Sequence, residues 1–70
     1  MLEVNKEYTY NFLGDFANKE NFEIEDNGKF NVGESFIILR SNQRDLVVSF
    51  ILTGCVGKDC MYKCVYSDFN

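Results

Sequence analysis

Three cysteines lie within twelve residues, in the stretch TGCVGKDCMYKC from residue 53 to residue 64. Thiols this close together could bind zinc, form a disulfide bond, act as a nucleophile, or pack as small apolar side chains. A structural zinc site takes four Cys or His ligands and often contains a C-x2-C knuckle. The chain has three cysteines and no histidine, and its spacings are C-x4-C and C-x3-C. We therefore expect neither a metal nor another cofactor.

A catalytic thiol needs a base to activate it, most often a histidine, so we predict that the protein is not an enzyme. Cys55 and Cys60 flank four residues of an expected hairpin turn, and a disulfide could join them. In a reducing cytosol that bond would not persist. We therefore favour packing of the cysteines as small apolar side chains, and leave open the redox state of Cys55, Cys60 and Cys64.

The length of 70 residues predicts a single small domain, residues 1–70. Seven Phe and four Tyr supply enough apolar area for a folded core. No apolar run approaches the roughly 20 residues of a membrane helix, and the first residues lack the apolar core of a signal peptide. We expect no membrane partner and a cytoplasmic location, in the host cytoplasm if the protein is encoded by a phage.

The net charge of −4 is unevenly distributed along the chain. Residues 1–26 carry seven carboxylates and two lysines, whereas residues 27–70 carry four carboxylates and five basic side chains. This asymmetry predicts a protein partner with a basic surface and makes nucleic acid a weaker candidate, although a solvated acidic face would give the same pattern. The candidate partner-binding residues are Glu7, Glu20, Glu23, Glu25 and Asp26.

Apolar residues alternate with period two along most of the chain, which predicts strands near 6–13, 21–25, 29–32, 35–41, 45–53 and 60–66. We expect at most one short helical turn near residues 15–20. The stretch VGESFII, residues 32–38, resembles the strand entries of SH3-like barrels. The predicted fold is all-β: a small antiparallel meander or SH3-like barrel of five to six strands.

Apolar pairing and turn chemistry set the expected registers. A three-residue loop at Asp26-Asn27-Gly28 would place Ile24 opposite Phe30 and Phe22 opposite Val32. In the last hairpin we expect Leu52 opposite Tyr62, Phe50 opposite Cys64 and Val48 opposite Tyr66. The hairpin of residues 35–53 is apolar on both faces, and we assign Ile37, Leu39, Val47 and Ile51 to its second face.

We therefore expect a small acidic protein-binding module without catalytic activity. The chain is short, rich in asparagine and free of Pro, His and Trp. In this composition it resembles small accessory proteins of phages and mobile elements. The best guess is an inhibitor of a host or defence protein, one that could itself handle nucleic acid. One alternative is a small barrel that binds nucleic acid through Arg40, Arg44, Tyr62, Lys63 and Tyr66. The other is a homo-oligomeric structural subunit joined through Ile37, Leu39, Val47 and Ile51.

Overall fold

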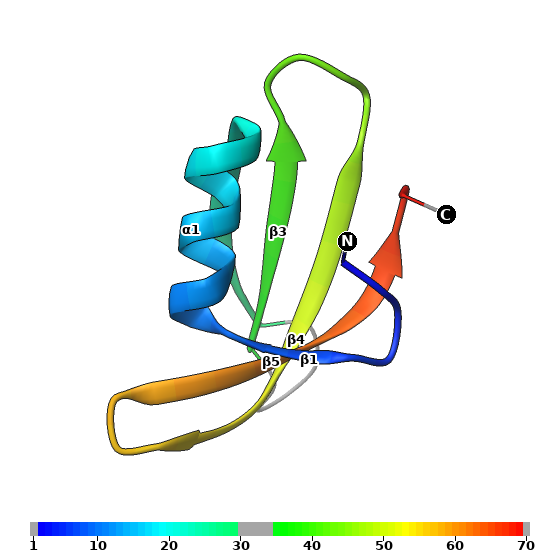
Figure 1. Ribbon diagram of the computed structural model, residues 1–70. Helices are drawn as coiled ribbons and strands as arrows, with labels where there is room; N and C mark the ends of the chain where they lie inside the picture. The colour runs from blue at the N-terminus through cyan, green and yellow to red at the C-terminus, as the bar shows by residue number, and fades with distance from the viewer. Residues whose placement is uncertain (1, 30–34, 70) are drawn as a thin grey trace.

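In the residues that the structure describes, one antiparallel sheet of five strands and one helix form the fold (Figure 1). The computed structural model describes residues 2–29 and 35–69, with the backbone alone for residues 26–29. The strand order across the sheet is β1-β5-β4-β3-β2. The elements, in chain order, are β1 Glu7–Thr9, α1 Tyr10–Glu20, β2 Phe22–Lys29, β3 Ser35–Ser41, β4 Val47–Val56 and β5 Asp59–Ser67.

The predicted all-β meander is confirmed, because β2, β3, β4 and β5 pair in sequence order. The sheet is not a closed barrel. Within the described residues β1 and β2 form its two opposite edges and do not pair with each other. The short β1 pairs only with β5, with Tyr8 opposite Tyr62.

A helix of eleven residues replaces the second half of the expected first strand. Thr9 caps it, since its Oγ1 accepts the backbone N–H of Phe12 at 3.1 Å. Leu13 and Ala17, four residues apart, are buried on the same face of α1. Asn21 ends the helix in the left-handed conformation, with φ of 59°. The expected strand 6–13 is thus wrong beyond Thr9, and the predicted turn at 15–20 is the second half of a longer helix.

The expected turn at residues 26–28 is also wrong, because β2 continues through it to Lys29. A bulge between Asp26 and Gly28 absorbs the irregularity, so that Gly28 pairs with Phe36. Ile24 lies opposite Leu39 and not opposite Phe30. The physical reason is that the long apolar β3 offers β2 a more extensive partner than residues 29–32 could. The predicted partners Phe30 and Val32 lie outside the described residues.

The register of β3 and β4 decides which apolar residues enter the core. Ile37 pairs with Phe50 and Leu39 with Val48, and directly paired residues share a face. All four are buried, with exposed fractions of 2% or less. The expected second face was therefore wrong for Ile37 and Leu39, because odd positions of β3 lie beside even positions of β4.

The last hairpin confirms two of its three expected pairs, Leu52 with Tyr62 and Phe50 with Cys64. The third is wrong, since Val48 lies opposite Ser67 and Tyr66 lies opposite Ser49. A bulge between the Ser49–Tyr66 and Phe50–Cys64 pairs adds one residue to β5 and turns Tyr66 to the other face. Figure 1 shows the end of this hairpin extending beyond the rest of the sheet.

The core lies between α1 and one face of the sheet, which we call the inner face. Tyr8, Phe16, Ile24, Leu46, Tyr62 and Phe69 pack around it. Its buried residues are Leu2, Leu13, Ala17, Phe22, Ile37, Leu39, Val48, Phe50 and Cys64. In the part of the chain that the structure describes, α1 is too short and too polar to cross a membrane.

Candidate functional site

The predicted acidic residues fall into two groups on opposite edges of the sheet. Glu23 and Glu25 lie on β2, with Glu20 at the end of the neighbouring α1. Glu7 lies on β1 at the other edge and accepts a hydrogen bond from Thr53 Oγ1 at 3.0 Å. The side chain of Asp26 lies outside the described residues. The structure therefore brings together Glu23 and Glu25 on β2, leaves Glu20 on α1, and places Glu7 at the opposite edge.

One guanidinium lies among three carboxylates on the β2 side of the sheet. Arg40 Nε donates to Glu25 Oε2 at 2.8 Å, and Glu23 lies directly across from Arg40 in the ladder. Glu25 raises the pKa of Arg40 through this hydrogen bond and its charge, with smaller contributions from Asp45 and Glu23. We call Glu23, Glu25 and Asp45 the acidic rim, because one arginine leaves their negative charge in excess.

Beside the acidic rim lies the face of the sheet that points away from the core, which we call the outer face. Its apolar centre consists of Phe36, Ile38, Val47 and Ile51, all half-buried. Phe36 pairs with Ile51, and Val47 pairs with Arg40. Ile38 lies opposite Glu25 on one side and Ser49 on the other. The apolar centre and the acidic rim are therefore directly adjacent on the outer face.

The candidate nucleic-acid residues do not form one surface. Tyr62 packs against the core on the inner face, whereas its neighbour Lys63 is exposed on the outer face. Arg40 is paired with Glu25, and the Tyr66 hydroxyl donates to Asp68 Oδ1. Arg44 lies in the turn between β3 and β4. The alternation of β5 thus separates Tyr62 from Lys63, and the one aromatic candidate on the face of Lys63 is Tyr66, which the bulge turns outward.

The three cysteines have two different environments. A disulfide joins Cys55 to Cys60 directly across the last hairpin, with Cα atoms 4.0 Å apart. Cys64 is a free thiol with no exposed surface, and burial raises its pKa. The interpretation as small apolar side chains is confirmed for Cys64 and wrong for the other two. The two-residue turn at Gly57-Lys58 is the reason, because it places Cys55 and Cys60 in direct register.

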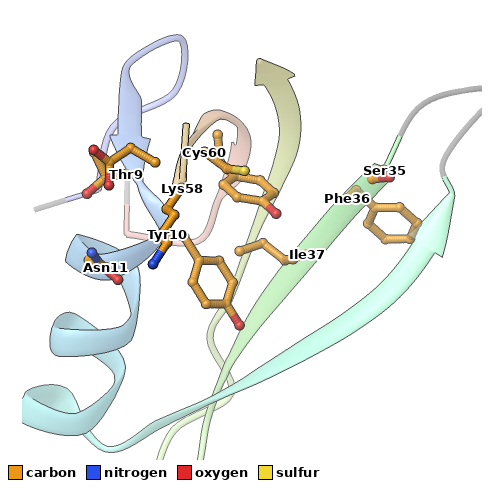
Figure 2. Close-up of a pocket in the computed structure, with 10 residues that line it drawn as sticks. Thr9, Tyr10, Asn11, Ser35, Phe36, Ile37, Lys58 and Cys60 are labelled. Carbon is orange, nitrogen blue, oxygen red and sulfur yellow. The ribbon is translucent and has the colours of Figure 1, made fainter. Parts of the chain in front are cut away.

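A cleft of about 440 Å³ opens between the start of α1, the start of β3 and the stapled end of the last hairpin (Figure 2). Tyr10 and Tyr62 contribute two rings with centroids 5.9 Å apart. Figure 2 shows the side chains of Tyr10 and Ile37 turned toward the same space, with Lys58 beside Tyr10. Its full lining is Thr9, Tyr10, Asn11, Ser35, Phe36, Ile37, Lys58, Asp59, Cys60 and Tyr62.

Sequence reasoning missed this cleft because it depends on the helix. With residues 6–13 read as a strand, Tyr10 had no reason to approach the last hairpin. The available signal was Thr9 followed at four-residue spacing by Leu13 and Ala17, which is typical of a capped amphipathic helix.

No family model matches this chain, and neither the curated proteins nor the solved structures include one that is similar to it.

Proposed function

We propose that this domain is a non-catalytic protein-binding module that docks its partner on the outer face of the sheet. The observation that carries the proposal is the continuity of the apolar centre, around Ile38, with the acidic rim. Within residues 2–29 and 35–69, the helix packs on the inner face and therefore does not cover the outer face. A contiguous apolar patch bordered by polar groups is typical of protein interaction sites.

Charge selects the kind of partner. The acidic rim keeps an excess of negative charge around Arg40, and the whole chain carries −4. Complementary potentials accelerate association and disfavour wrong partners. The occupant is therefore a protein whose contact surface has an apolar centre flanked by lysines or arginines. A second copy of this chain would bring a second net negative charge to the contact.

The finer role that we propose is inhibition. A small acidic domain on a basic surface would exclude whatever anion normally binds there, and many strongly basic protein surfaces bind nucleic acid. We therefore propose an inhibitor of a host or defence protein that handles nucleic acid, of the phage or mobile-element type. The size of the chain and the chemistry of its outer face support this role.

Two substitutions test the docking surface. Ile38→Asp places a charge in the apolar centre, and Glu23→Lys reverses a rim charge without removing the ion pair of Glu25. A tagged chain is incubated with nuclease-treated bacterial lysate, and captured proteins are quantified by mass spectrometry. We expect one protein captured in near-stoichiometric amount, reduced about tenfold or more by Ile38→Asp, because central interface residues carry most of the binding energy. Glu23→Lys should reduce capture several-fold.

The matched control is Asp15→Lys, a charge reversal on the exposed surface of α1. It changes net charge as Glu23→Lys does, so capture should match that of the original chain. Circular dichroism confirms that each variant is folded. Equal capture by Ile38→Asp, Glu23→Lys and the original chain would refute the proposed surface, as would capture that disappears with nuclease.

A further inference from the structure

We propose that the cleft between α1 and the last hairpin binds a free α-amino acid with an aromatic side chain. The cleft lies between the helix start and the last hairpin and shares Phe36 with the apolar centre of the outer face. The aromatic and charged groups argued from below lie outside that centre, so the role of the cleft does not depend on the docking proposal. Its volume of about 440 Å³ lies in the lower part of the range for small-molecule sites. A single aromatic amino acid is small enough to enter it.

The walls of the cleft favour an aromatic side chain. Tyr10 and Tyr62 meet at an interplanar angle of 47° with ring centroids 5.9 Å apart, and Ile37, which is 2% exposed, lies at the buried end of the cleft. A third ring that enters beside them gains both apolar burial and ring–ring contacts. These surfaces come from the helix start, β3 and β5, so the fold itself fixes their spacing.

The charged groups at the mouth favour a zwitterion. Lys58 and Asp59 both line the cleft, and both are exposed at the end of the hairpin. An amino acid carries its carboxylate and its ammonium on one carbon, so it can meet both signs at one place. The Lys58 ammonium would bind the carboxylate, and the Asp59 carboxylate would bind the ammonium, through charge-assisted hydrogen bonds.

The disulfide restrains the backbone of the turn that carries this charged pair. Cys60 lines the cleft and is bonded to Cys55 across the strand, immediately next to the turn that carries Lys58. A site whose groups are fixed before binding loses less entropy when the ligand enters. The disulfide-linked end of the hairpin is therefore a preorganised wall of the cleft.

Three related probes test the proposal by NMR titration of the ¹⁵N-labelled full chain. L-phenylalanine carries both charges, phenylacetate carries only the carboxylate, and phenethylamine carries only the ammonium. We expect L-phenylalanine to give saturable shifts at Tyr10, Ile37, Lys58 and Tyr62, and to bind several-fold more tightly than either fragment, because each ion pair with an exposed group is worth up to about fivefold.

Two cleft variants and one control complete the test. Lys58→Gln and Asp59→Asn should each weaken L-phenylalanine binding by up to about fivefold, whereas Lys63→Gln, on the outer face of β5, should leave it unchanged. Well-dispersed spectra confirm that the variants are folded. The proposal is overturned if L-phenylalanine gives no saturable shifts, if a fragment binds as tightly as the amino acid, or if Lys63→Gln weakens binding as much as Lys58→Gln.

Discussion

At the scale of single residues, the Asp68 carboxylate links the end of β5 to the start of β4 through hydrogen bonds. Its Oδ2 accepts the backbone N–H of Val47 at 2.9 Å, and its Oδ1 accepts the hydroxyl of Tyr66. Both bonds favour the ionised carboxylate, and that of Tyr66 is the larger cause of a lowered Asp68 pKa. The same contact raises the pKa of Tyr66. Only the bulge before Tyr66 makes this contact available, because it turns the ring to the outer face.

Acid should weaken the fold through Asp68. Its pKa is lower in the folded chain than the usual 3.8, so its contribution is complete above the unfolded value and is lost as the pH falls through the folded value. We expect the urea midpoint of the original chain to fall more steeply below about pH 4 than that of Asp68→Asn. Tyr66→Phe should bring the Asp68 pKa, followed by carboxyl NMR, closer to its usual value. Parallel acid curves for the original chain and Asp68→Asn would contradict the assignment.

At the scale of elements, the strands of the second half were predictable, and those of the first half only in part: the expected strand 21–25 lies within β2, whereas residues 10–13 of the expected first strand are helical. Between residues 35 and 67 long apolar runs meet tight turns, and the pairs Leu52–Tyr62 and Phe50–Cys64 followed from apolar matching alone. In the N-terminal half two patterns compete. Tyr8, Tyr10 and Phe12 alternate as in a strand, while Leu13 and Ala17 repeat as in a helix. Local alternation could not reveal that β1 ends at Thr9.

The candidate sites were predictable to a smaller degree, for a related reason. A strand's face assignment follows from one register choice, and a shift of one residue exchanges the faces. Ile37 and Leu39 were assigned to the wrong face in this way, and the bulge before Tyr66 moved a ring that alternation had placed inside. The cleft requires three elements that are distant in sequence, so no short motif indicates it.

Truncation of two neighbouring residues separates the helix from the strand interpretation of residues 10–13. In α1, Leu13 has no exposed surface and Phe12 is 49% exposed. We expect Leu13→Ala to lower the free energy of unfolding by about 2–5 kcal/mol, as large-to-small changes in a core do. Phe12→Ala should cost less than Leu13→Ala, because it removes a half-exposed ring and one stacking contact, that with Tyr8. Urea unfolding monitored by fluorescence of the tyrosines measures both. A larger cost for Phe12→Ala than for Leu13→Ala would contradict the helix.

At the scale of the whole molecule, the fold separates two surfaces. The inner face and α1 enclose the core and leave the cleft at one end, while the outer face carries the apolar centre and the acidic rim. The charged residues also lie at opposite sides of the sheet. Glu23 and Glu25 are on the edge strand β2, and Glu7 is on the edge strand β1, where it pairs with Lys63 of β5. Phe36 belongs to both surfaces, so a partner on the outer face would contact the cleft at this residue.

The state of association tests which molecule covers the outer face. Self-association through the expected set is ruled out for Ile37 and Leu39, because both are in the core. A contact between two outer faces would have to bring two negatively charged chains together.

We expect light scattering at low salt to give the monomer mass of 8.1 kDa across about a tenfold range of concentration, because charge repulsion is least screened there. In about 1 M salt, where the Debye length is about 3 Å, weak dimers should form, and Ile38→Asp should abolish them. A dimer at low salt that Ile38→Asp dissociates would mean that a second copy of the chain occupies the outer face, and the proposal of a basic partner would then be wrong.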